Sequence, residues 1–496
     1  MEGIEKLNLI KNYAGQRITE GLDNKTLESF LTPQSSLAKA IDQAFDLHLK
    51  LKSEYDSILK MDEKKQIELV QESFLNFYQQ ETINPYVALS AYGPWIVTTC
   101  GAVIHDNGGY GMLGFGHQPE EIIASMADST HVMANIMTPN LMQHKLGLLL
   151  DKEIGHTRTD SHQSLYEKYI CLNSGSECVT IALRLSDILA KKNTDPGEVY
   201  EGRQIKLLSF QGGFHGRTDY PSQASDSCLS KYKKYLASFR DRDNLLTIEP
   251  NSIEQLESIF QQADEENWYI QALLIEPVMG EGNPGLALDP KFYKKARELT
   301  LKYNSFLIMD SIQSGFRANG CLSFLDYPGF QNVLPADCEI YSKALNAGQY
   351  PLSILALSAR SNALYKRGLY GNTMTTNPRA LETAVAVLDN ITPELRDNIR
   401  DRGKEMVEKL KILQAKYPEQ ILEVQGTGLL VCAELNPDTL QVVGFDKVEV
   451  WCRKHGLGVI HGGVNALRYT PNFAITSKEI DLVVDITERA IEAFIA

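Results

Sequence analysis

Residues 305–310, SFLIMD, form a short apolar run that ends in an aspartate, and residues 338–343, CEIYSK, form a second such run that ends in a lysine. A short apolar run of this kind is typical of a buried strand, and parallel strands deliver the residues that follow them to one edge of a sheet. We therefore expect Asp310 and Lys343 to lie at the same sheet edge. Such a pair suits a cofactor that the amine binds covalently and the carboxylate tunes electronically.

Short apolar runs alternate with helical patterns through the middle of the chain. Strands are expected at 168–172, 205–210, 272–275, 306–309 and 352–357, and a helix at 179–189. Strands separated by helical segments indicate an α/β fold with a mostly parallel sheet that is covered on both faces. After residue 388, a charged helical segment at 393–417 is followed by segments at 429–435 and 448–455, and together they indicate a smaller mixed α/β domain.

The first 80 residues have a helical and polar pattern. Helices are expected from Ser35 and Ser36 to Lys52, and again at 64–79, because apolar residues recur there at helical spacing. We find no residues typical of a reactive site in this segment. An extension that packs on the main body, or on a dimer partner, is the favoured interpretation.

Composition and charge exclude several classes of protein. The chain has 496 residues, which predicts two or more domains, and its 43% hydrophobic and 23% charged residues are ordinary for a soluble protein. A net charge of −14 argues against sequence-independent binding to nucleic acid. The N-terminus is charged and no stretch is long and apolar enough to span a membrane, so no membrane attachment is expected.

The eight cysteines are scattered, and none forms a C-x-x-C pair. This spacing argues against a metal site, and it favours a reduced, cytoplasmic setting. Residues 109–114, GYGMLG, match the G-x-G-x-x-G pattern, but a lone match is weak. Because no strand that ends in an acidic residue stands at the required place, a tight glycine loop near a ligand is favoured over a dinucleotide site.

Several strand ends carry residues that could bind a ligand. Ser174, Gly175 and Ser176 stand between a strand and a helix, where free backbone N–H groups can bind phosphate, although an ordinary helix cap is the simpler reading of this motif alone. Phe214 follows the next strand and could stack on a planar ring or belong to the core. Its neighbour His215 could be an ordinary surface histidine.

Charged side chains follow the same and later strands. Arg217 has the planar fork that suits a substrate carboxylate. Glu276 closes the strand at 272–275, and the loop at 280–282, GEG, contains Glu281. A buried Asp310 should face a cation or a protonated ring nitrogen, although it could simply cap a helix. Gln313 follows one turn later.

Six motifs occur in an order that resembles the class III aminotransferases: NSGSE at 173–177, GFHGRT at 213–218, EP at 276–277, DSIQSG at 310–315, SKAL at 342–345 and GNTM at 371–374. The likeness runs from about Trp95 to the C-terminus. It implies a pyridoxal 5'-phosphate (PLP) enzyme of fold type I, with a large cofactor domain and a small domain built from both chain ends. The implied segments are 1–80 for the extension, 81–135 and 386–496 for the small domain, and 136–385 for the large domain.

The resemblance also implies roles for single residues. Lys343 would form the Schiff base and transfer the proton, and Asp310 would keep the ring nitrogen protonated. Cofactor contacts would come from Ser174, Gly175, Ser176, Phe214, His215, Glu276 and Gln313. Thr373 would bind the phosphate of the neighbouring subunit, which implies a homodimer with a shared active site.

The substrate is implied by the F-H-G-R-T string, which looks most like the branch that acts on 4-aminobutyrate, lysine or ornithine at the ω-amine. Arg217 would hold the distant carboxylate of the amino donor. Arg468 would receive the α-carboxylate of 2-oxoglutarate, and Glu281 would pair with that arginine between the half-reactions.

This chain departs from the family pattern, and other functions stay open. Ser311 stands where the family usually has a glutamate, and the extension before Trp95 is longer than usual. A decarboxylase, racemase or aminomutase would use the same lysine and aspartate, because the bond that is cleaved depends on its orientation to the ring. A non-catalytic interaction protein with this fold is a further alternative.

Overall fold

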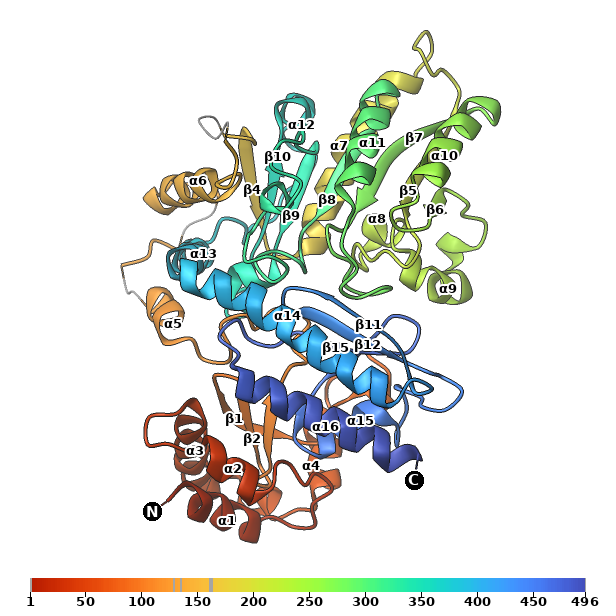
Figure 1. Ribbon diagram of the computed structural model, residues 1–496. Helices are drawn as coiled ribbons and strands as arrows, with labels where there is room; N and C mark the ends of the chain where they lie inside the picture. Colours follow the sequence, from red (N-terminus) through yellow and green to blue (C-terminus); the bar gives the residue numbers. More distant parts are fainter. Residues whose placement is uncertain (1, 128–129, 134–135, 160–163, 496) are drawn as a thin grey trace. The chain divides into compact units, whose positions relative to one another are not determined.

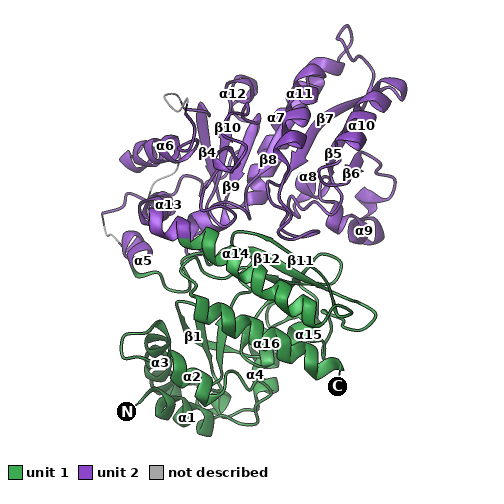
Figure 2. Cartoon of the chain, viewed as in Figure 1, with its two compact units in different colours: residues 1–120, 398–496 green, residues 121–397 purple. Residues whose placement is uncertain are grey.

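A computed structural model describes residues 2–127, 130–133, 136–159 and 164–495. The chain divides into two compact units: unit 1 comprises residues 1–120 and 398–496, and unit 2 comprises residues 121–397 (Figure 2). The domain boundary that we expected between 135 and 136 falls on residue 135, which lies outside the described residues. Each unit is described below by itself.

The described residues of unit 2 form a seven-stranded sheet (Figure 1). Its strands are β4 (Lys168–Leu172), β5 (Gln204–Phe210), β6 (Leu245–Ile248), β7 (Trp268–Ile275), β8 (Phe306–Asp310), β9 (Cys338–Tyr341) and β10 (Ser353–Leu357). Their order is β4-β10-β9-β8-β7-β5-β6, and β10 alone runs antiparallel to its neighbours. The expected mostly parallel sheet is confirmed. The edge strand β6 was missed, because four residues carry too little pattern to be recognised.

Helices cover both faces of this sheet. Helix α7 (Gly175–Thr194) shares one apolar cluster with alternate strand residues such as Leu207, Ala272 and Ile308. Phe210, three residues after Leu207, points to the opposite face, because successive side chains in a strand alternate. Its ring contacts Phe292 of α11 (Pro290–Lys302) at 5.3 Å between centroids. The sheet core is therefore buried on both sides.

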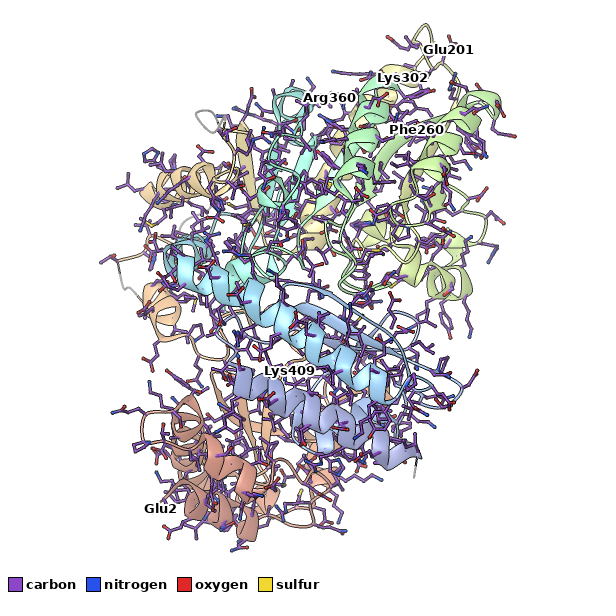
Figure 3. The ribbon with its side chains drawn as sticks, viewed as in Figure 1. Glu2, Glu201, Phe260, Lys302, Arg360 and Lys409 are labelled. Carbon is purple, nitrogen blue, oxygen red and sulfur yellow. The ribbon has the colours of Figure 1, made fainter. Side chains whose placement is uncertain are left out.

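Further helices of the middle region are α5 (Glu120–Met126), α6 (Leu141–Glu153), α8 (Asp219–Ser222), α9 (Asp226–Tyr235), α10 (Ile253–Glu265), α12 (Ala359–Leu364) and α13 (Pro378–Asn390). The buried carboxylate of Asp337 fixes the start of β9. It pairs with Arg297 of α11 and with Arg360 of α12, each at 3.0 Å, and it accepts a hydrogen bond from the Leu307 amide at 2.8 Å. Arg360 is labelled in Figure 3. Because a buried charge is costly unless it is paired, these contacts hold β8 and β9 in register.

Unit 1 contains two four-stranded sheets. The first has the order β1 (Ala88–Tyr92), β2 (Trp95–Thr98), β3 (Val103–Asp106) and β13 (Leu457–Gly458). The second has the order β11 (Ile421–Thr427), β12 (Leu430–Leu435), β15 (Ala466–Tyr469) and β14 (Ile460–Gly462). Because β13 pairs with β3, a strand from the C-terminal segment completes the N-terminal sheet. Helices α14 (Pro393–Lys416), α15 (Val448–Lys454) and α16 (Ser477–Ile495) belong to the C-terminal segment.

The N-terminal extension contains α1 (Gly3–Tyr13), α2 (Asn24–Phe30), α3 (Ser36–Leu59) and α4 (Glu63–Gln71). The helix that we expected over 64–79 is wrong beyond Gln71. In the segment that follows, the Asn76 side chain accepts a hydrogen bond from the Tyr78 amide at 3.0 Å, and such local bonds compete with a helix. None of the helices in the described part of the chain combines the length and apolarity needed to cross a bilayer.

Candidate active site

The structure brings Asp310 and Lys343 to one edge of the large sheet. Strands β8 and β9 are parallel neighbours, with Asp310 opposite Ile340, so both strands end on the same side. Lys343 begins a short 3-10 helix, η4 (Lys343–Asn346), and its Nζ donates a hydrogen bond to Oε1 of Gln313 at 3.1 Å. The amine, the amide and the carboxylate therefore form one group at the carboxyl end of the strands.

Lys343 has a φ of 48°, in the left-handed region that residues other than glycine rarely adopt. Such a conformation costs about 1–3 kcal/mol and persists only where the surroundings impose it. Here Ser342 donates a hydrogen bond to the Leu352 carbonyl at 3.2 Å, and Asn346 donates to the same carbonyl at 2.8 Å. The side chains on both sides of the lysine are thus tied to the residue that precedes β10, which holds this segment in place.

Asp310 and His215 form a buried pair. Nδ1 of His215 lies 2.9 Å from Oδ2 of Asp310, and their side chains are 1% and 4% exposed. Burial lowers the pKa of His215, but the hydrogen bond and charge of Asp310, with the charge of Glu276, raise it by more, so the net pKa lies above its ordinary value. The alternative of an ordinary surface histidine is therefore wrong, and a buried imidazole faces Asp310.

Glu276 follows β7 at the same edge and has two backbone donors. Its Oε1 accepts from the Phe214 amide at 3.0 Å and its Oε2 accepts from the Gly280 amide at 2.9 Å. Burial raises the pKa of this carboxyl to about 7, because the ionised form loses its hydration. Glu276 thus joins the loop after β5 to the loop after β7.

The N-terminus of α7 offers unused donors. Ser174 caps the helix, because its side chain accepts a hydrogen bond from the Glu177 amide at 3.3 Å. The expectation of an ordinary helix cap is therefore correct for this side chain. Among the described residues, no hydrogen bond from the backbone N–H groups of Gly175 and Ser176 is found. Gly216, with a φ of 117°, leaves no room for a Cβ, which would meet Ser176 Oγ at 2.4 Å. Two orphan donors at a positive helix end suit a phosphate group.

An aromatic side chain and a hydrogen-bond donor that could contact a planar ring also belong to the candidate site. Phe214 is half-buried, and the buried Nε2 of Gln313 has no hydrogen-bond partner among the described residues. A Cβ at Gly280 would meet Gln313 Oε1 at 2.2 Å, so a side chain at this position would displace the Gln313 amide. The residues present fit PLP. The site offers an amine, a buried carboxylate, an amide N–H without a partner among the described residues and a helix end suited to phosphate, and these match the groups of that cofactor.

Three expected substrate or cofactor residues lie in unit 2 with less burial. Arg217 is exposed, its guanidinium carbon lies 5.3 Å from the Phe214 ring centroid, and it donates to the sulfur of Cys228 at 3.3 Å. Glu281 is partly buried in the loop after β7, and Thr373 is exposed between α12 and α13.

Arg468 belongs to unit 1, where it lies in β15 and is 1% exposed. Its guanidinium carbon lies 5.3 Å from the ring centroid of Tyr110. The glycine loop at 109–114 therefore contacts the expected carboxylate-binding arginine. The structure describes this pair by itself and does not place it against the residues of unit 2.

Sequence reasoning missed residues that support the site. Ser225 accepts from the His215 amide at 2.9 Å and fixes that loop, although the residues are ten apart. Glu177 accepts hydrogen bonds from Tyr370 at 2.7 Å and Asn372 at 2.8 Å, which joins helix α7 to the segment that carries Thr373. Only the S-x-x-E capping pattern at 174–177 signalled Glu177 in the sequence, and nothing signalled Ser225.

Comparison with known proteins identifies the family. Residues 78–491 match the family described as aminotransferase class-III. The acetylornithine aminotransferase of Prochlorococcus marinus is 29% identical over 331 residues, which cover 65% of this chain and 73% of that protein. The ornithine aminotransferase of Staphylococcus carnosus is 27% identical over 414 residues, which cover 83% of this chain and 94% of that protein.

Solved structures share the fold. The ornithine aminotransferase of Toxoplasma gondii ME49 has a TM-score of 0.73 at 22% identity, covering 89% of this chain and 98% of that one. An amine transaminase from an uncultivated Pseudomonas species, in its PLP-bound form, has a TM-score of 0.71 at 20% identity, covering 85% and 99%. At this level of identity the likeness establishes the architecture alone.

Proposed function

The chain belongs to the class III aminotransferases, PLP-dependent enzymes of fold type I, and from this premise we propose that it transfers the amino group of an ω-amino acid to 2-oxoglutarate. The donor would be of the 4-aminobutyrate, lysine or ornithine type. Ornithine and acetylornithine, which name two of the relatives, both carry an amine and a carboxylate at separated positions. The observation that carries the proposal is the cluster of Lys343, Gln313, Asp310 and His215 at one sheet edge.

We assign the cofactor contacts as follows. Lys343 would bind PLP covalently, the N–H groups of Gly175 and Ser176 would bind its phosphate, and Phe214 would cover one face of its ring. When bound, PLP supplies an electron sink that stabilises negative charge on the carbon next to the transferred amine. Nε2 of Gln313 would donate to the ring hydroxyl, which would satisfy its hydrogen-bonding capacity.

Asp310 and His215 would control the electronics of the site. Asp310 would hold a proton at the ring nitrogen, because a buried carboxylate stabilises a nearby positive charge. Nδ1 of His215, whose pKa is raised, lies 2.9 Å from Oδ2 of Asp310 and would hold that carboxylate in place. His215 is itself oriented by the Ser225 contact. Lys343 would then act as the base that moves a proton at the reacting carbon, with Gln313 orienting its Nζ.

The substrate carboxylates would be bound by two arginines. Arg217 is exposed and lies over the Phe214 ring, and its planar fork suits the carboxylate of the donor. Arg468 would bind the α-carboxylate of 2-oxoglutarate, and Glu281 would exchange with that substrate group. A panel of ω-amino acids mixed with 2-oxoglutarate tests the proposal. We expect glutamate only when both substrates are present. If none of the ω-amino acids yields glutamate, the proposal is rejected.

We also propose a homodimer in which Thr373 contacts the partner's cofactor. Large apolar side chains are exposed in unit 2, among them Met137 and Leu141 at 81% and Met374 at 55%. Contact with a second subunit would remove the apolar surface of these side chains from water. The prediction of a cytoplasmic protein without nucleic-acid or membrane partners stays a prediction; the free state of all eight cysteines suits a reducing compartment.

A hybrid-dimer experiment tests the shared site. Lys343→Ala and Thr373→Ala subunits are mixed, unfolded partially to exchange subunits, and assayed. If Thr373 acts on the partner, one site of each hybrid is intact, and roughly a quarter of wild-type activity returns. If Thr373 acts on its own subunit, the mixture is no more active than the Thr373→Ala enzyme alone.

A further inference from the structure

The aromatic side chain of Tyr78 lies in unit 1, at the end of the N-terminal extension. Its ring stacks on that of Tyr110, with 5.6 Å between centroids and 22° between planes. The Tyr110 ring in turn lies 5.3 Å from the guanidinium carbon of Arg468. The three side chains therefore form one continuous column from the extension to an arginine that is 1% exposed.

Tyr110 is held in an unusual backbone conformation. Its φ is 51°, which is rare for an aromatic residue, and strained residues of this kind gather at functional sites. The next residue, Gly111, donates a hydrogen bond to Thr470 Oγ1 at 3.3 Å, and the Thr470 amide donates to the Asn107 carbonyl at 2.8 Å. Because Thr470 follows β15 directly, these bonds fasten the Tyr110 loop to the strand that carries Arg468.

The chain is joined to other parts of unit 1 both before and after Tyr78. Before it, Gln66 of α4 accepts a hydrogen bond from Thr99 Oγ1 at 2.7 Å, which joins the extension to the first sheet. After it, the Thr82 carbonyl accepts from the buried Arg453 at 2.6 Å. Tyr78 and Tyr110 both line a cavity of about 570 Å³ within unit 1. The extension therefore presents the Tyr78 ring at a defined position beside the cavity.

We propose that Tyr78 is a positioning residue that acts through Tyr110 to orient the Arg468 guanidinium, so that the extension tunes the affinity for the keto-acid acceptor. This inference rests on the proposed role of Arg468 as a carboxylate-binding residue. A guanidinium binds a carboxylate well only when its planar fork is aligned with both oxygens. An aromatic ring against its face restricts the rotation of that plane, and a second ring stacked on the first restricts the first ring.

The matching family segment begins at residue 78, so the residues of the extension before Tyr78 lie outside the match. The stack is therefore made at the junction between the extension and the family core. Neighbouring aromatic residues of the extension offer a matched control. Phe74 is 79% exposed, and no ring contact of it is found among the described residues.

The test measures steady-state kinetics of the PLP-loaded full-length enzyme with 2-oxoglutarate and a saturating ω-amino acid. We expect Tyr78→Ala to raise the KM for 2-oxoglutarate roughly two- to tenfold, the factor that corresponds to one lost aromatic pair. The KM for the amino donor and kcat should change less than about twofold. Tyr78→Leu, which keeps apolar volume without a stacking ring, should give the same rise, and Tyr78→Phe should restore the wild-type KM.

Control variants separate this inference from the function on which it rests. Phe74→Ala should leave all constants unchanged, and Arg468→Ala should raise the KM for 2-oxoglutarate more than Tyr78→Ala does. If Arg468→Ala raises it and both Tyr78→Ala and Tyr78→Leu leave it unchanged, the inference is overturned while the role of Arg468 stands. If the Tyr78 variants raise the KM for the amino donor as much as the KM for 2-oxoglutarate, Tyr78 has a merely structural role. That result would also overturn the inference. An unchanged KM in Arg468→Ala would remove the role of Arg468, and the inference with it.

Discussion

Replacing Glu276 with glutamine should make the cofactor-free protein more stable at neutral pH. The Glu276 carboxyl is buried, and its pKa is raised from 4.5 to about 7 because the ionised form is desolvated. The folded state therefore binds this proton more tightly than the unfolded chain does. The resulting stability is fully present below pH 4.5 and is lost as the pH rises toward 7. A glutamine has no proton to lose, so the variant should not show this loss.

The magnitude follows from the size of the shift. A rise from 4.5 to about 7 corresponds to roughly 3 kcal/mol of unfolding free energy. Glutamine resembles the protonated carboxyl in shape, and either of them can accept from only one of the Phe214 and Gly280 amides without a rearrangement. The two proteins should therefore be similarly stable near pH 5, and the variant should gain up to about 3 kcal/mol near pH 8.

Urea unfolding of the cofactor-free protein, followed by circular dichroism between pH 5 and pH 8, measures the difference. Glu266→Gln, at an exposed position after α10, is the matched control and should follow the wild-type pH dependence. Buried Glu339, whose pKa is also raised to about 7, remains in every variant, so a residual slope is expected. Equal pH slopes for Glu276→Gln and wild type would refute the reasoning. The same substitution should lower transaminase activity, because Glu276 joins two loops of the site.

Three further substitutions probe the cofactor and substrate contacts. Lys343→Ala should abolish turnover and covalent PLP attachment; borohydride reduction followed by peptide mapping checks this, and a labelled peptide from another lysine in the wild type would contradict it. Gly216→Ala should destabilise the protein by about 1–3 kcal/mol and weaken PLP binding, because its φ is 117° and a Cβ would meet Ser176 Oγ at 2.4 Å; thermal melts and PLP titration measure both, and wild-type values would show that the loop relaxes at no cost. Arg217→Lys should raise the KM for the amino donor roughly tenfold with little change in kcat, because a point charge replaces a planar fork; an unchanged KM in steady-state assays would remove Arg217 from the donor site.

The sequence by itself determined the central strands of the large sheet, the sheet type and the residues at those strand ends. The runs that end at Asp310 and before Lys343 are local patterns, and burial on both faces makes such strands continuously apolar. Their order along the chain was enough to predict a mostly parallel sheet. The resemblance of six short motifs then led to the family that the comparison identified over residues 78–491.

The tertiary structure alone decided which side chains meet. His215 could be read as a surface residue because its partner Asp310 is 95 positions away, and only the packing of β5, β7 and β8 brings the two within 2.9 Å. The early end of α4 likewise depends on side-chain bonds that compete with the helix. The contact of Tyr110 with Arg468 joins two distant parts of the chain. Periodicity reports which face of an element is buried, whereas the partner of a polar group depends on contacts that folding brings together from distant positions.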